Sequence, residues 1–229
     1  MVPQSIMDNF APWFLLAVMA SAASVVADPD DAETRIRAMT NEFRTSQGVP
    51  AIASDSKLSS AAREFASYMA RTGQYGHEAD GRTPALRAKS QGYESCMVAE
   101  NVAYLERSRE FSAEELARGF MNGWKNSPGH RRNLLDKDVM QFGVAVSRAK
   151  DGRYYAVQLF AQPASAMTNF EVRNPSAATV SYRVGETAYS LGPREWRTHG
   201  ICRVMTLYLP GARALMPRNG DRFTIGGER

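Results

Sequence analysis

The stretch of sequence that decides the fold lies at residues 124–135 and reads WKNSPGHRRNLL. It closes a segment whose apolar side chains recur on one helical face, at Leu116, Phe120, Met121 and Trp124. The Ser-Pro-Gly run at residues 127–129 breaks this helix. His130 then stands in a glycine-flanked loop, and residues 130–135 can form one further helical turn.

Upstream of this stretch the sequence predicts further helices. The first spans residues 30–48, and the second begins at Asp55 or Ser56 and ends near Gly73. Residues 83–90 predict a short helix with proline in its first turn. The pattern Ser112-x-x-Glu115 is a capping box that begins the helix leading to Trp124. Residues 97–104, MVAENVAY, are apolar around a polar pair and receive no assignment.

Downstream the hydrophobic period changes from near four to two. Residues 141–146 and 154–161 predict two strands, and the turn signal at residues 150–153 joins them as a hairpin. Helices followed by an antiparallel hairpin give an α+β pattern for residues 28–163.

From residue 164 to residue 229 almost no helical periodicity remains. Short strand candidates alternate with Pro and Gly turn signals, at residues 170–173, 179–184, 187–191, 195–198 and 204–209. The sequence therefore predicts a small all-β C-terminal module that follows the first domain, with a sandwich as a candidate arrangement.

Two of the three histidines stand in glycine-flanked loops, and a carboxylate lies between them in the chain: His77, Glu100 and His130. A carboxylate inside an apolar segment is costly to bury unless it is paired or solvated. Two imidazoles and one carboxylate could bind a divalent ion, for which zinc is the natural candidate. Without metal they could act as general acid and base near neutral pH. Each histidine alone is also compatible with a merely exposed loop position.

The motifs around these residues add a resemblance. Gly76-His77, the E-N-V-A run from Glu100, the W-x-x-S-P-G-H-R-x-N-L-L run and the Y-x-V-Q-x-F-A run from Tyr155 occur in this order. Over residues of about 33 to 162 the chain resembles the bacterial branch of the CAP superfamily of cysteine-rich secretory, antigen-five and pathogenesis-related proteins. The resemblance implies an α-β-α sandwich with a central antiparallel sheet.

The resemblance also implies a solvent-open cleft lined by two histidines and acidic residues, which match His77, Glu100 and His130. In eukaryotic relatives a second glutamate stands where this chain has Ser127. Its loss weakens a metal site on His77 and His130 and leaves an acid–base pair incomplete. Asn101 and Gln158 are further candidates for the cleft, but Asn101 can instead satisfy backbone groups, and Gln158 can point across the sheet. Ser127 can also be a helix N-cap residue.

Three functions follow as hypotheses. The first is an exported binding protein whose cleft, with or without Zn²⁺, binds a small lipid, glycan or peptide. The second is a hydrolase of cell-wall polymer or peptide that uses metal or His/Glu chemistry. The third is a structural envelope protein. A fold resemblance alone names no ligand.

The composition and the N-terminal residues indicate export. Hydrophobic residues make up 44% and charged residues 23%, a composition that argues against a disordered chain. Residues 10–27 carry no charge, and Ala27 ends a plausible cleavage site, so residues 1–27 predict a signal peptide. Asp8 and the lack of Lys or Arg before the apolar run leave an uncleaved membrane anchor or an ordinary buried helix as alternatives. We expect a secreted or periplasmic protein.

The remaining expectations concern partners and cysteines. The net charge of +4 suits anionic cell-wall polymers or lipid headgroups, or is simply a solvated basic surface, and no motif indicates nucleic acid. The C-terminal module could hold an envelope or extracellular partner. Cys96 and Cys202 are the only cysteines, and export favours a disulfide between them over two unrelated thiols. The third histidine, His199, reads as a turn residue beside a structural cysteine.

Overall fold

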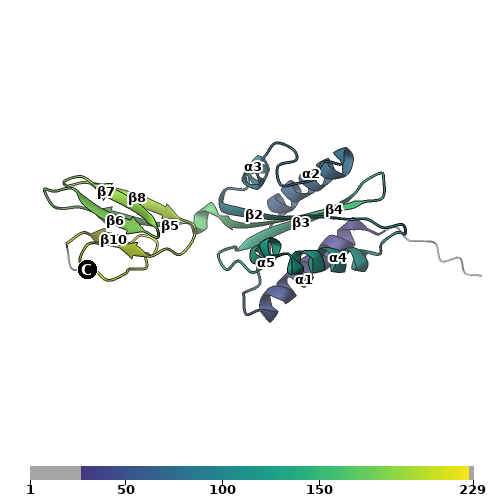
Figure 1. The fold of residues 1–229 in the computed structure, drawn as a ribbon, viewed down its shortest axis with the longest axis horizontal. Coiled ribbons are helices and arrows are strands. Elements are labelled where there is room, and N and C mark those ends of the chain that lie inside the picture. Colours follow the sequence, from purple (N-terminus) through teal and green to yellow (C-terminus); the bar gives the residue numbers. More distant parts are fainter. Residues whose placement is uncertain (1–26, 227–229) are drawn as a thin grey trace, which may run out of the picture.

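The computed structural model describes residues 27–226, which form two lobes along one axis (Figure 1). The larger lobe is built around a four-stranded sheet in the order β1-β3-β4-β2. Its strands are β1 (Ala53–Ser54), β2 (Ser95–Leu105), β3 (Gln141–Arg148) and β4 (Tyr154–Pro163). Strands β2, β4 and β3 pair antiparallel, and the two-residue β1 adds parallel to β3.

Helices cover both faces of this sheet, which makes the α-β-α sandwich that the family resemblance implies (Figure 1). On one side lie α1 (Pro29–Ser46), α4 (Ala113–Asn126) and α5 (Pro128–Leu134); on the other lie α2 (Ser56–Thr72) and α3 (Pro84–Ser90). The predicted caps are present: Asp55 begins α2, left-handed Gly73 ends it, and Ser112 and Glu115 form the reciprocal capping box of α4.

Two apolar cores separate the layers, because successive residues of a strand point to opposite faces. Phe142, Val144 and Val146 of β3 pack against α1 and α4, and Ala145 packs against α2. Gly143 also faces α2, and a Cβ there would lie 2.2 Å from the carbonyl carbon of Leu58. The glycine thus lets the α2 backbone rest directly on the sheet.

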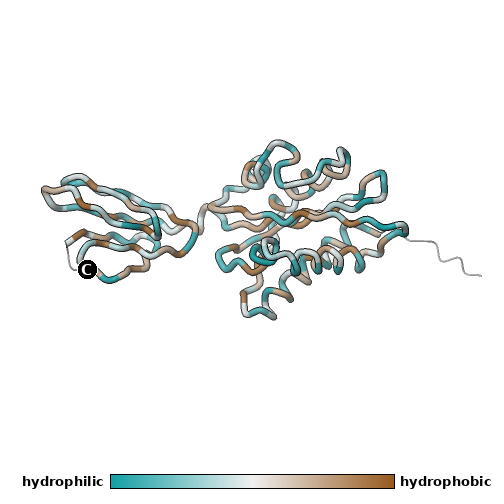
Figure 2. The backbone as a smooth tube through the Cα atoms, viewed as in Figure 1, coloured by the Kyte–Doolittle hydropathy of each residue, from teal (hydrophilic) through white to brown (hydrophobic). Residues whose placement is uncertain are grey.

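The smaller lobe is all β, as the sequence predicts. It contains two three-stranded sheets, in the orders β10-β5-β8 and β7-β6-β9. The strands are β5 (Thr168–Arg173), β6 (Val180–Val184), β7 (Thr187–Leu191), β8 (Trp196–Ile201), β9 (Leu207–Tyr208) and β10 (Arg222–Thr224). A single apolar cluster lies between the sheets and includes Phe170, Val172, Val184 and Leu207. In Figure 2 hydrophobic segments alternate with hydrophilic ones along these strands.

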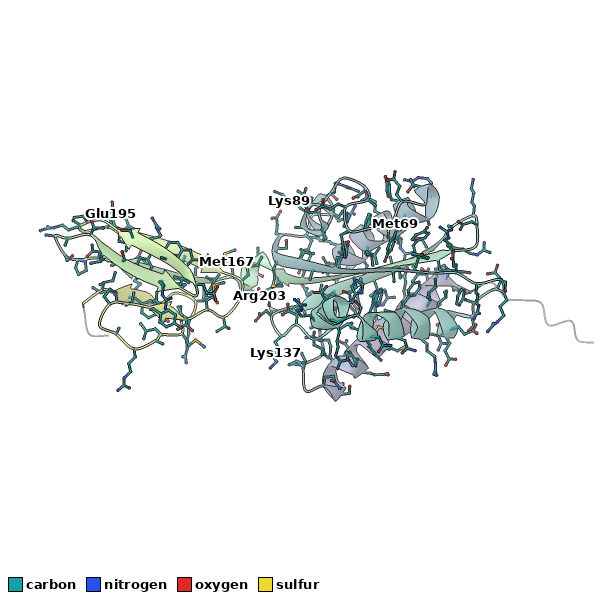
Figure 3. The ribbon with its side chains drawn as sticks, in the orientation of Figure 1. Met69, Lys89, Lys137, Met167, Glu195 and Arg203 are labelled. Atoms are coloured by element: carbon teal, nitrogen blue, oxygen red, sulfur yellow. A yellow bond between two sulfur atoms is a disulfide. The ribbon has the colours of Figure 1, made fainter. Side chains whose placement is uncertain are left out.

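The two lobes meet at the short 3-10 helix η1 (Ala164–Ala166) and are joined by two further links. The predicted disulfide between Cys96 of β2 and Cys202, which follows β8, is present. Arg203 pairs with Asp136 and Asp138 in the loop after α5. Figure 3 shows Arg203 at this junction, near Met167, while Glu195 lies at the far end of the smaller lobe.

The structure assigns one segment that the sequence left open and corrects one expectation. Residues 97–104, which received no assignment, belong to the long strand β2. His199 does not lie in a turn but in strand β8. Its ring is buried, stacks on Phe170, and shares a 2.6 Å hydrogen bond between Nε2 and the Tyr182 hydroxyl. A buried histidine fits there because the hydroxyl satisfies its nitrogen.

The predicted signal peptide lies almost entirely outside the described residues, which begin at Ala27. Within residues 27–226 no helix is long and apolar enough to cross a membrane. The predicted domain boundary after residue 163 implies that residues 28–163 and 164–229 fold independently, and it stays a prediction.

Candidate functional site

The candidate site lies at the open edge of the sheet, along β2. Among the described strands it pairs with β4 alone, so its outer carbonyls need other partners. The Asn133 side chain of α5 donates to the Glu100 carbonyl (3.1 Å), and the Tyr75 hydroxyl donates to the Val102 carbonyl (3.2 Å). The loop that carries His77 and the helix that carries His130 thus approach the same edge from the two helical layers.

Glu100 is the buried anchor of the site. Its side chain is 1% exposed and lies on the face of β2 that points toward α2 and α3. One carboxylate oxygen bonds His77 Nδ1 at 2.9 Å, and the other accepts from Arg87 Nη2 at 2.7 Å. Both oxygens are therefore engaged, and His77 is held with its Nε2 directed away from Glu100.

Arg87 is a positioning residue that the sequence interpretation did not single out. Its side chain is fully buried and stacks on the Phe65 ring, 3.6 Å from the ring centroid. It bonds Glu100, donates to the His77 carbonyl at 2.7 Å, and pairs with Asp80 at 2.7 Å. Burial acts to raise the pKa of Asp80, but the Arg82 backbone N–H and the Arg87 charge hold that pKa below its usual value.

His130 is positioned through its backbone and its helix. Asn101 is fully buried on the other face of β2; its amide donates to the His130 carbonyl (3.3 Å), and its oxygen accepts from Asn133 (2.9 Å). Arg44, also buried, donates to the Leu134 carbonyl at 2.8 Å and so satisfies the end of α5. These bonds place Asn101 beneath the site, in the role of satisfying backbone and amide groups.

The two site histidines face each other with ring centroids 6.4 Å apart and ring planes tilted by 57°. The hydrogen bond to Glu100 raises the pKa of His77, although burial opposes it. Burial, followed by the nearby charge of His77, lowers the pKa of His130. The pair thus combines an imidazole that favours its protonated form with one that favours its neutral form.

The other predicted site residues take different places. Gln158 is fully buried, and its amide donates to Thr40 Oγ1 of α1 at 2.8 Å, so it points into the core rather than toward the histidines. Ser127 joins α4 and α5 and is half-buried, but its side chain makes no capping hydrogen bond. Its backbone N–H and carbonyl continue the two helices instead.

In the part of the chain that the structure describes, no carboxylate or thiolate joins the two histidines as a third ligand. Among residues 27–226 no group of three or more His, Cys, Asp or Glu side chains is arranged to hold a metal ion. A surface cavity of about 820 Å³ lies elsewhere, at the C-terminal end of α2 and the β3–β4 turn, and it includes neither histidine.

Comparisons with known proteins agree with this fold. The family model of the cysteine-rich secretory protein family (CAP) matches residues 37–160, which is more than half of the chain. No curated protein matches the sequence.

Several solved structures are similar to this one. An outer surface protein from Borrelia burgdorferi is 22% identical with a TM-score of 0.51, and the match covers 62% of this chain and 99% of that one. An extracellular SCP-domain protein from Bacillus anthracis is 23% identical (TM-score 0.49; 58% of this chain, 41% of that one). A cysteine-rich secretory protein from Staphylococcus aureus is 20% identical with a TM-score of 0.45, and the match covers 59% of this chain and 40% of that one.

Proposed function

The chain belongs to the cysteine-rich secretory protein (CAP) family, and we propose that it is an exported binding protein whose His77–His130 pair contacts a small lipid, glycan or peptide. The observation that carries this proposal is the state of Glu100. Both of its oxygens are engaged, by His77 and Arg87, and the side chain is buried. It positions an imidazole for a ligand and is not free to attack or to deprotonate one.

Zinc is the proposed metal for this pair, and the residues fit it in part. Zinc-bound histidines commonly hold their other nitrogen against a carboxylate, as His77 does with Glu100. The lowered pKa of His130 favours the neutral imidazole that binds metal. Bound zinc would supply a Lewis acid. Two imidazoles on one tetrahedral ion have centroids about 5 Å apart, so the pair, at 6.4 Å, must close slightly.

A hydrolase acting on cell-wall polymer or peptide is the alternative. The observation in its favour is that the two histidines have pKa values shifted in opposite directions, which is how environments separate an acid from a base. Against it stand the engaged carboxylate of Glu100 and the serine at position 127, where eukaryotic relatives have a second glutamate. Hydrolysis assays are justified if the pair binds zinc.

Export and location are part of the same proposal. A disulfide such as Cys96–Cys202 persists in oxidising compartments, and residues 10–27 have the composition of a signal peptide. The structurally similar Borrelia protein is an outer surface protein. We propose a secreted or periplasmic location, with anchoring by the N-terminal apolar segment as the alternative.

Isothermal calorimetry with zinc tests the His77–His130 site of this proposal on the protein beginning at Asp28. We expect one equivalent to bind wild type, and His77→Ala or His130→Ala to abolish binding. Arg132→Gln is the matched control, because Arg132 is exposed on the same helix and makes no side-chain hydrogen bond among the described residues. Unchanged binding in both histidine variants would overturn a site on this pair. A wild type that binds no zinc removes the metal-dependent part.

A further inference from the structure

The net positive charge of the chain lies entirely in its C-terminal part. Residues 164–229 contain nine arginines, no lysine and five acidic residues, whereas residues 1–163 contain nineteen basic and nineteen acidic residues. The whole excess of +4 therefore belongs to the β lobe. Arginine binds phosphate through paired N–H donors. A lobe whose basic residues other than His199 are all arginines therefore suits a phosphate-bearing surface.

The same lobe exposes large apolar side chains beside strand β9. These form what we call the β9 patch: Val204 (72% exposed), Met205 (39%), Tyr208 (40%) and Met216 (62%). Exposed apolar groups gathered on one surface mark an interaction site more often than exposed groups scattered singly.

Two members of the patch, Tyr208 and Met216, lie on the same side of the lobe. Leu207 and Leu215 form an antiparallel bridge with both side chains inward, so Tyr208 and Met216 point outward on the same side. Met216 Sδ lies 3.8 Å from Thr206 Oγ1. Met205 Sδ would lie 3.7 Å from a Cβ placed on Gly185, at the end of β6.

One arginine contacts this apolar surface, and two more stand close to Met216 in the chain. Arg183 pairs with Tyr208 across β6 and β9, and its guanidinium lies 4.6 Å from the centre of the tyrosine ring. Arg213 and Arg218 flank the segment that ends in Met216, and both are exposed. Within residues 27–226 no carboxylate forms an ion pair with Arg183, Arg213 or Arg218. Their charge is therefore available to an external anion.

We propose that the β9 patch and these three arginines dock the protein on a membrane surface that contains anionic phospholipid. Phosphate groups would meet the guanidinium groups, while Tyr208, Met216 and their neighbours would enter the boundary between headgroups and acyl chains. The disulfide and the ion pairs of Arg203 would hold the larger lobe to the docked lobe. This inference does not depend on a ligand at the histidines.

Vesicle flotation tests the charge requirement, with the protein beginning at Asp28 so that the N-terminal apolar segment cannot insert. We expect binding to equimolar phosphatidylcholine–phosphatidylglycerol vesicles and not to phosphatidylcholine alone. Replacing Arg183, Arg213 and Arg218 by glutamine should reduce binding by about fivefold per arginine, or about a hundredfold in all. The control replaces the same number of exposed lysines, Lys89, Lys137 and Lys150, by glutamine and should reduce it far less.

The apolar requirement separates a membrane from a soluble polyanion. The double variant Tyr208→Ser with Met216→Ser should lose about tenfold in vesicle binding, with circular dichroism and unfolding curves unchanged. Three results would each overturn the proposal: no binding to anionic vesicles, equal losses in the arginine and lysine variants, or full binding by the double variant. A fourth result would also replace the proposal: polyphosphate binds wild type and the double variant equally well, while vesicles are not bound. The arginines would then belong to a site for a soluble polyanion.

Discussion

At the scale of single residues, Glu100 determines the properties of the candidate site. It fixes the His77 ring through Nδ1 and takes its second bond from a buried arginine. A carboxylate in this position orients an imidazole and favours its protonated form. The residue that the sequence marks as an acidic site member thus acts through His77.

Replacing Glu100 by Gln should reverse the pKa shift of His77. The hydrogen bond that raises this pKa is weakened, and burial together with Arg87 then lowers it below the usual value of about 6.5. NMR titration of the histidine rings measures this directly. A His77 that titrates above the usual value in Glu100→Gln would contradict the assigned cause.

The two histidines also give opposite contributions to stability against pH. The raised pKa of His77 contributes stability that is fully present below about pH 6.5. This contribution is lost as the pH rises through the pKa of His77 in the folded state. The lowered pKa of His130 destabilises the fold in acid, because the unfolded chain then binds more protons. Ring titrations, which resolve each residue, are therefore more informative than a global stability curve.

Replacing Arg87 by Met should destabilise the fold by about 3–5 kcal/mol, because it leaves Glu100 and Asp80 buried without their charged partner. Urea unfolding gives the value. Arg82→Met is the matched control: Arg82 also pairs with Asp80, but it is partly exposed and its loss should lower stability by about 1 kcal/mol or less. Equal effects of the two variants would show that Arg87 is not the partner on which the buried pair depends.

At the scale of elements, the contact between α2 and β3 depends on Gly143. A Cβ there would lie 2.2 Å from the backbone of Leu58 and of Ser59, so Gly143→Ala must push the helix off the sheet. We expect a loss of about 3 kcal/mol or more in free energy of unfolding.

Gly123→Ala is the control for this substitution, since Gly123 lies in α4 with no atom within 4 Å of an added Cβ. There alanine should stabilise the protein by about 0.5–1 kcal/mol, through its better helix propensity. Urea unfolding of both variants would contradict the packing account if Gly143→Ala were as stable as wild type.

The elements that the sequence predicts well carry local signals. Ser112 and Glu115 form their capping box, and Asp55 and Gly73 bound α2 as expected. Strand β2 was missed because both of its faces are covered, so Glu100 and Asn101 are buried on opposite sides and no alternation remains. The two-residue β1 and the three-residue β10 are too short to give any period.

The site was predicted less completely than the fold. The motifs give His77, Glu100 and His130. Gln158 shares a face of β4 with Ala156 and Phe160, but its hydrogen-bond partner there, Thr40, stands 118 residues away in the chain. Nothing local in the sequence marks the Arg87 side chain as buried, because arginine side chains are mostly exposed. Contacts of this range follow from packing, which periodicity does not encode.

At the scale of the whole molecule, the links between the lobes start from the elements that hold the site. Cys96 belongs to β2, which carries Glu100, and Asp136 and Asp138 follow α5, which carries His130. The β lobe is therefore tied to both elements that position the histidines.

Replacing both Cys96 and Cys202 by Ser should lower the free energy of unfolding by about 4–5 kcal/mol, because the bridge closes a loop of more than a hundred residues. Arg203→Gln removes the ion pairs but keeps the bridge, and should lower it by about 1 kcal/mol or less. Thermal or urea unfolding under oxidising conditions compares them. A cysteine variant as stable as wild type would leave the ion pairs and η1 as the link that matters.

Zinc titration followed by nitrogen-15 NMR of the histidine rings tests the central claim most directly, since all three histidines report separately. The account predicts that His77 and His130 shift together up to one equivalent, that His77 Nδ1 stays protonated against Glu100, and that the buried His199 does not move. Signals of His77 and His130 that stay unchanged at saturating zinc, or that respond at different equivalents, would contradict a single site built on this pair.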